Sequence, residues 1–161
     1  MEPIVTEFFR HNLWANLKVL DVCAGLPDAT LDATVAGTYG SIRETLVHLL
    51  SAEGRYIETF GGEPPGIPLA EEDPFPGFDL LRKRAHLSGE ALIDLAAACP
   101  PDRILTGTYE GHPYEMRAGI LFAHAIAHSV EHRTHIETIL TQQGIEPPET
   151  DGVAYFQEAV V

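Results

Sequence analysis

Apolar residues recur every three or four positions along four long stretches of the chain, a spacing that predicts four amphipathic helices. The first helix is expected over residues 3–24 and the third over residues 78–98. The second begins at Ser41, because Ser41-Ile42-Arg43-Glu44 has the form of a capping box, and it ends near Gly61. The fourth helix is expected over residues 115–143.

The segments between these helices favour loops and extended structure. Glycine and proline are frequent in residues 61–77, which predicts a loop over one end of the helices. Residues 104–109 contain β-favouring side chains and precede a Glu-Gly turn signal, a pattern compatible with a short two-stranded ribbon. A short C-terminal helix is expected over residues 152–160. With no interior linker, the chain is predicted to be all-α, one four-helix-bundle domain over residues 1–161.

The acidic composition argues against several classes of partner. Ten Lys and Arg against 24 Asp and Glu give a formal net charge of −14. Such a surface repels the phosphates of nucleic acids and anionic lipids, so we expect neither nucleic acid nor a membrane as a partner. The N-terminal residues lack the basic and apolar regions of a signal peptide, and no apolar run reaches the ~18 residues of a membrane span. We therefore expect a cytoplasmic protein.

Histidine is the residue type that points to chemistry. His124, His128, His132 and His135 fall on one face of the fourth predicted helix, within about 80° on a helical wheel. Two imidazoles four residues apart can bind one divalent ion, and a third ligand must then come from a facing helix. His48, in the middle of the second apolar stretch, is the only helical candidate. A metal ion binds neutral imidazole and so removes the repulsion between clustered protonated histidines.

Other interpretations of these residues remain open from the sequence. The histidine face could pack against neighbouring helices or act as a pH-sensitive patch. Residues 128–132 also match HxxEH, the inverted zinc-protease motif, in which Glu131 would be the general base. Glu44 and Glu53 are further candidates for a base. Arg133 could hold an anionic substrate or, as the sequence favours, pair with a carboxylate one turn later.

Four motifs mark the first, second and fourth predicted helices and the segment that follows them. They are Asn12-Leu13-Trp14-Ala15-Asn16; residues 40–48 followed by Ala52-Glu53; His124-x₃-His128-x₃-His132-Arg133; and residues 144–148, Gly-Ile-Glu-Pro-Pro. In this order and spacing they resemble the DinB family, also described as DinB/YfiT-like metalloenzymes. Thr134-His135 departs from the Gly-Gln that is common in the family at this place.

The resemblance implies a four-helix bundle, often a homodimer, with a three-histidine site for a divalent metal. Carried over residue by residue, the ligands are His48, His128 and His132. His124 matches a frequent family histidine that is not usually counted as a ligand, and His135 is not inherited as one. Nickel, zinc and iron all suit imidazole. Three protein ligands leave coordination positions open, as is typical of catalytic sites.

Three functions are consistent with this pattern. Because relatives include thiol-dependent transferases and a thiol-dependent isomerase, the resemblance implies an S-transferase that uses a low-molecular-weight thiol. The alternatives are a metal-dependent hydrolase and a non-catalytic stress protein that binds a metal or a small ligand. Residues 61–77 and 104–116 are expected to shape the mouth of a substrate pocket.

Overall fold

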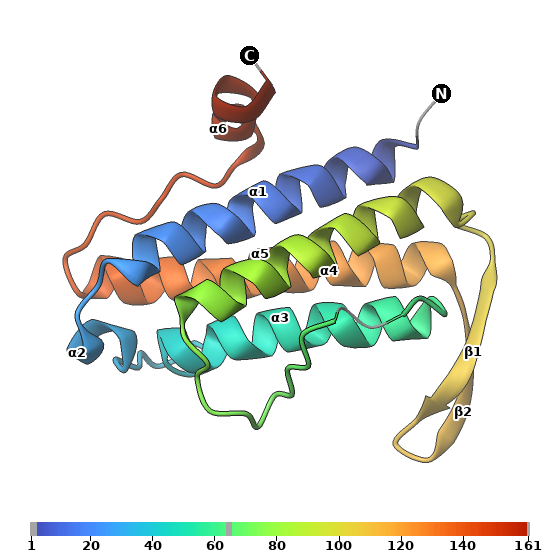
Figure 1. Cartoon of the computed structure of the whole chain (residues 1–161), viewed down its shortest axis with the longest axis horizontal. Helices are drawn as coiled ribbons and strands as arrows, with labels where there is room; N and C mark the ends of the chain where they lie inside the picture. Colours follow the sequence, from blue (N-terminus) through green and yellow to red (C-terminus); the bar gives the residue numbers. More distant parts are fainter. Residues whose placement is uncertain (1–2, 64–65, 161) are drawn as a thin grey trace.

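The computed structural model describes residues 3–63 and 66–160 of the chain. In chain order its elements are α1 (Ile4–Ala24), α2 (Asp28–Leu31), α3 (Ile42–Thr59), α4 (Phe78–Ala98), β1 (Ile104–Tyr109), β2 (His112–Arg117), α5 (Ala118–Gln142), α6 (Gly152–Tyr155) and the π-helical turn η1 (Phe156–Val160). Figure 1 shows the four long helices packed side by side, with the β1–β2 hairpin projecting at one end. The predicted helical bundle with a short ribbon is therefore confirmed.

The predicted ends of the long helices agree with the structure except at the start of one helix. At the start of α3, the Glu44 backbone N–H donates to Ser41 Oγ at 3.3 Å and the Ser41 N–H donates to Glu44 Oε2 at 2.8 Å, which completes the predicted capping box. The prediction that the fourth long helix begins at Glu115 is wrong. Glu115 pairs with Thr106 in the hairpin, and α5 begins only at Ala118.

Two further segments, α2 and the loop over residues 61–77, lie between the long helices. The single-turn helix α2 was not predicted from the sequence. Within the predicted loop over residues 61–77, positions 64 and 65 lie outside the described residues. In the part of the chain that the structure describes, no helix is long and apolar enough to cross a membrane.

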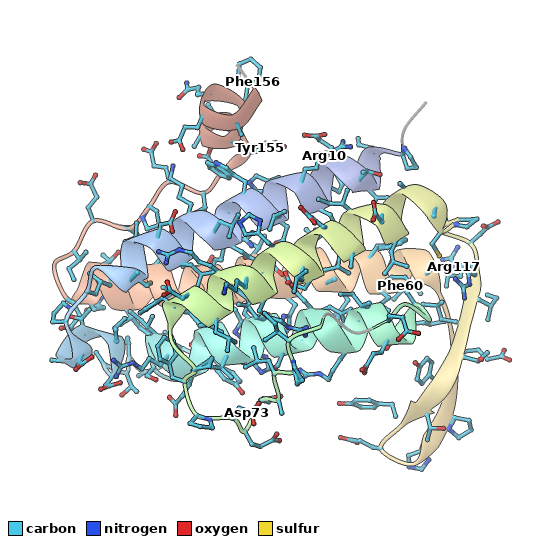
Figure 2. All side chains as sticks on the ribbon, viewed as in Figure 1. Arg10, Phe60, Asp73, Arg117, Tyr155 and Phe156 are labelled. Carbon is cyan, nitrogen blue, oxygen red and sulfur yellow. The ribbon has the colours of Figure 1, made fainter. Side chains whose placement is uncertain are left out.

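Each long helix of the bundle packs mainly against two others. The principal contacts join α1 to α4, α4 to α3, α3 to α5 and α5 back to α1, so α1 and α3 lie diagonally across the bundle. The loop between α3 and α4 runs alongside α3 before it enters α4, and Figure 2 shows Asp73 on its outer bend. α3 thus has this loop along its length and the hairpin beyond its C-terminal end.

The interior consists of two apolar clusters with a polar layer between them. The cluster nearer the hairpin contains Phe9, Tyr56, Phe60, Leu92 and Phe122, and the other contains Leu20, Ile42, Leu50, Leu81 and Ile136. The polar layer is formed by Asn12, Asn16, Glu53, Arg84, Ser88 and Arg133, none of which is more than 3% exposed. Buried polar groups need hydrogen-bond partners, so this layer fixes how the helices fit together.

Candidate metal centre

Three histidines from two helices meet between α3 and α5. His48 comes from the middle of α3, and His128 and His132 come from successive turns of α5. Each offers one ring nitrogen, and these three nitrogens lie within 4.8 Å of one another. His48 Nε2 and His128 Nε2 are 3.0 Å apart. Two nitrogens that each lie ~2.0–2.1 Å from one metal ion are separated by about 3 Å when the angle between them is close to 90°, so the spacing fits a shared ion.

The environment of the two α5 histidines favours their neutral forms. Burial, reinforced by the neighbouring imidazoles, lowers the pKa of His128 to about 3 and that of His132 to about 4. The Nδ1 atoms of both rings are buried and have no hydrogen-bond partner among the described residues. Neutral imidazole is the form that binds a metal. The donor set therefore fits a divalent transition metal.

Glu71, from the loop between α3 and α4, orients His48. Its Oε1 lies 2.8 Å from His48 Nδ1 and also accepts a hydrogen bond from the Tyr39 hydroxyl. The hydrogen bond from Tyr39, with that from His48, holds the pKa of Glu71 below its usual value. An ionised carboxylate can only accept, so the proton of His48 lies on Nδ1 and the Nε2 lone pair points into the cluster.

Tyr39 covers the same side of the cluster. Its ring stacks on His48 with centroids 4.1 Å apart and meets His132 edge-on at 5.2 Å. Burial and the bond to Glu71 raise the pKa of Tyr39 to about 12, so the hydroxyl remains a donor at neutral pH. The sequence did not identify Glu71 or Tyr39 as partners of the histidines, because each lies in a loop outside any helical period.

The remaining candidates lie beside the cluster. His124 Nε2 is 3.2 Å from the Tyr56 hydroxyl oxygen, and the His124 ring lies 5.7 Å from that of His128. The His135 ring lies 5.3 Å from that of His132. Neither His124 nor His135 belongs to the three-nitrogen group. Glu131 is exposed on α5, and Glu44 is engaged in the capping box.

Glu53 and Arg133 belong to the polar layer. Glu53 Oε1 accepts from Asn16 Nδ2 at 2.9 Å and from Asn12 Nδ2 at 3.2 Å, and Oε2 accepts from the Ser88 hydroxyl. Arg133 Nη1 donates to Asn12 Oδ1 and Asn16 Oδ1, both at 2.7 Å. The expected pairing of Arg133 with a carboxylate one turn later is met only as a longer-range attraction to Glu137, because the guanidinium turns inward to the two asparagines. The two asparagines of the first motif are the bridge between Glu53 and Arg133.

Comparison with known proteins agrees with this fold. The structure matches the crystal structure of a DinB-like protein from Bacillus cereus ATCC 10987 with a TM-score of 0.70 and 18% identity, over 90% of this chain and 94% of that chain. At this identity the likeness shows the fold alone. No curated protein matched the chain. The model of the DinB family, in contrast, matches residues 1–159, and the chain therefore belongs to the DinB family.

Proposed function

We propose that this DinB protein is a metal-dependent enzyme that transfers a low-molecular-weight thiol to an organic electrophile. The observation that supports it is the cluster of three ring nitrogens within 4.8 Å, built from histidines on two rigid helices. In such a transfer the sulfur forms a bond to carbon, the leaving group departs with its bonding electron pair, and the thiol proton passes to solvent. The thiol must therefore reach the electrophile as a thiolate.

His48, His128 and His132 would hold nickel, zinc or iron. When bound, the metal would supply a Lewis acid that favours the thiolate over the thiol at neutral pH. The protein contributes orientation: Glu71 fixes the tautomer of His48, and Tyr39 covers the ring. Such partners of a metal-binding imidazole set its direction and basicity.

Hydrolysis is supported less well, because a general base that takes a proton from the attacking water requires a free carboxylate at the cluster. Glu53 is committed to the polar layer, and Glu44 to the capping box. Glu71 does lie at the cluster, but it already accepts from His48 and Tyr39 and pairs with Arg55 at 3.5 Å. The available carboxylate thus positions a ligand rather than serving as a base.

The first experiment is elemental analysis of tag-free protein by inductively coupled plasma mass spectrometry. We expect about one nickel, zinc or iron per chain in the wild type, retained in His86→Ala and lost in His128→Ala. His86 is the matched control because it is an exposed histidine on α4. Absence of metal in the wild type, even after reconstitution with each ion, would remove the basis for a metal enzyme.

The second experiment measures activity with the metal-loaded protein. Glutathione, bacillithiol and mycothiol are each paired with a panel of electrophiles, and thioether formation is followed by mass spectrometry. Turnover in the wild type and in His86→Ala, but not in His128→Ala, is the expected result. Metal binding without any thiol-dependent turnover would favour a non-catalytic metal-binding protein. Turnover of an ester or amide panel would instead favour a hydrolase.

The homodimer implied by the resemblance stays a prediction. Ile120 and Val130 on α5 are about half exposed, at 52% and 46%. Sedimentation velocity over a range of protein concentrations would distinguish a monomer from a dimer.

A further inference from the structure

A cavity of about 470 Å³ lies between α3, α5 and the hairpin. Its walls include Arg55 and Tyr56 from α3, His124 from α5, and Tyr109, Tyr114 and Met116 from the hairpin. Figure 2 shows Phe60 at the adjoining end of α3, beside the hairpin. A volume of this size falls in the range of small-molecule sites, ~300–1,000 Å³.

The inner end of this hairpin cavity is one ring away from the histidine cluster. The Tyr56 ring meets both His124 and His128 edge-on, with centroids 5.5 Å and 5.9 Å apart. Arg55 connects the two places as well, because it pairs with Glu71, the partner of His48. A molecule in the cavity would therefore approach the cluster from the side of Tyr56 and His124.

The walls of the cavity are chiefly aromatic and apolar. Tyr109 is 71% exposed at the end of β1, although most large apolar side chains of the chain are buried. Tyr114 lies across from Gly107 in the ladder, and a Cβ at Gly107 would lie 2.6 Å from the Tyr114 hydroxyl oxygen. Glycine at this position therefore lets the Tyr114 ring lie across β1. The exposed Tyr109 ring and the half-buried Tyr114 ring both line the cavity, and aromatic faces favour stacking with a flat ring system.

Among the described residues that line the cavity, Arg55 carries a permanent charge. Its side chain is 50% exposed, and its Nη1 donates to Ser51 Oγ at 3.2 Å while Nη2 faces Glu71 at 3.5 Å. A guanidinium has five N–H donors, so donors remain for a further acceptor. In a chain with a net charge of −14, a cation on an aromatic wall favours a ligand that brings its own negative charge.

We propose that the hairpin cavity binds an aromatic compound of one or two rings that bears a single acidic group. Its rings lie between Tyr109 and Tyr114, and its acidic group faces Arg55. This inference rests on the proposed function in that such a compound is the electrophilic substrate presented to the histidine cluster. The hairpin then determines substrate specificity, and the cluster provides the site for the thiol.

Binding of 1-naphthoate, measured by isothermal titration calorimetry and by naphthoate fluorescence, tests this proposal. We expect saturable binding that Tyr109→Ala weakens about fivefold, the size of one aromatic pair. Ile104→Ala is the matched control, since Ile104 is 54% exposed on the same strand but does not line the cavity. Arg55→Gln should weaken naphthoate about tenfold and leave 1-naphthalenemethanol, which has no charge, within about twofold.

The competing location is a second, more apolar groove beside the start of α1, lined in part by Ile4 and Phe8. Loss of naphthoate binding in Phe8→Ala, with Tyr109→Ala unchanged, would place the compound there and overturn the proposal. Equal binding by Tyr109→Ala and Ile104→Ala, or no binding to the wild type at millimolar naphthoate, would also overturn it. Circular dichroism melting confirms that each variant is folded.

A failure of this proposal is distinguishable from a failure of the proposed function. His128→Ala should abolish metal binding and change naphthoate binding by no more than about twofold, because His128 does not line the cavity. Tyr109→Ala should leave the metal content unchanged. Naphthoate binding by a protein that holds no metal would refute the metal-dependent enzyme and support the proposed cavity ligand. Metal binding without naphthoate binding would overturn the proposed cavity ligand and leave the metal site supported.

Discussion

Replacing Arg133 by methionine removes the cation from the polar layer while it keeps most of the side-chain volume. Arg133 is 3% exposed, and its two hydrogen bonds to Asn12 and Asn16 are both 2.7 Å long. Each hydrogen bond to a charged group contributes about 1.5–3 kcal/mol. Removal of one member of a buried ionic network costs about 3–5 kcal/mol, because the other members lose their partner. Both routes predict a loss of about 4 kcal/mol in the free energy of unfolding.

Arg82→Met is the matched control on α4. Arg82 Nε donates to Asp21 Oδ1 at 2.7 Å, but both side chains are substantially exposed, at 34% and 66%. An exposed ion pair contributes about 0–1 kcal/mol, so this variant should be nearly as stable as the wild type.

Urea unfolding followed by circular dichroism, with a chelator present to exclude any bound metal, measures both variants. At about 2–4 °C per kcal/mol for a chain of this size, Arg133→Met should also melt roughly 10 °C lower. If Arg133→Met lost no more stability than Arg82→Met, the layer would not be an energetically coupled network. The physical account of the first sequence motif would then be wrong.

Three further predictions concern titratable groups of the site and of the polar layer. Glu71→Gln should weaken zinc binding about 10- to 100-fold in a competition titration. Glu72→Gln, one residue along the exposed loop, should bind zinc as the wild type does. Equal zinc affinities of the two variants would exclude the orienting role of Glu71. Burial raises the pKa of Glu53 from 4.5 to about 7, so the folded protein holds a proton that the unfolded chain releases, and stability falls as pH rises. The difference in unfolding free energy between the wild type and Glu53→Gln should therefore shift by about 1 kcal/mol between pH 6 and pH 8, and a constant difference would contradict it. The pKa of His132 is lowered from 6.5 to about 4, so the unfolded chain binds a proton first and metal-free protein loses stability as pH falls through this window. His132→Gln should reduce that acid sensitivity in urea titrations, and an unchanged slope would refute the assignment.

The fold could be predicted because its four helices carry strong local signals. The capping box at Ser41 and the apolar period behind it place α3 within a residue of its observed start. The start of α5 was predicted too early, because Glu115, Met116 and Arg117 are all good helix formers but are held by pairing with β1. Strand pairing is a non-local interaction, so the helical period could not exclude these residues from the helix.

The three-histidine cluster could be predicted only in part from the residues alone. The spacing of His128 and His132 fixes that they share a helix face, but not whether that face is opposite His48. The order of the family motifs supplied that information. Glu71 had no such signal: it lies in a proline-rich loop whose path depends on how α3 and α4 are joined, and that path is set by tertiary contacts.

The buried arginine and asparagines of the polar layer help to orient the three histidines of the cluster. His132 and Arg133 are consecutive on α5, so their side chains point about 100° apart around the helix axis. When Arg133 is fixed to Asn12 and Asn16 of α1, His132 and His128 face His48 of α3. Glu53 of α3 receives hydrogen bonds from the same two asparagines, so the rotation of α3, which carries His48, is fixed by the same groups. The hydrogen bonds of the interior thereby determine the direction of all three imidazoles.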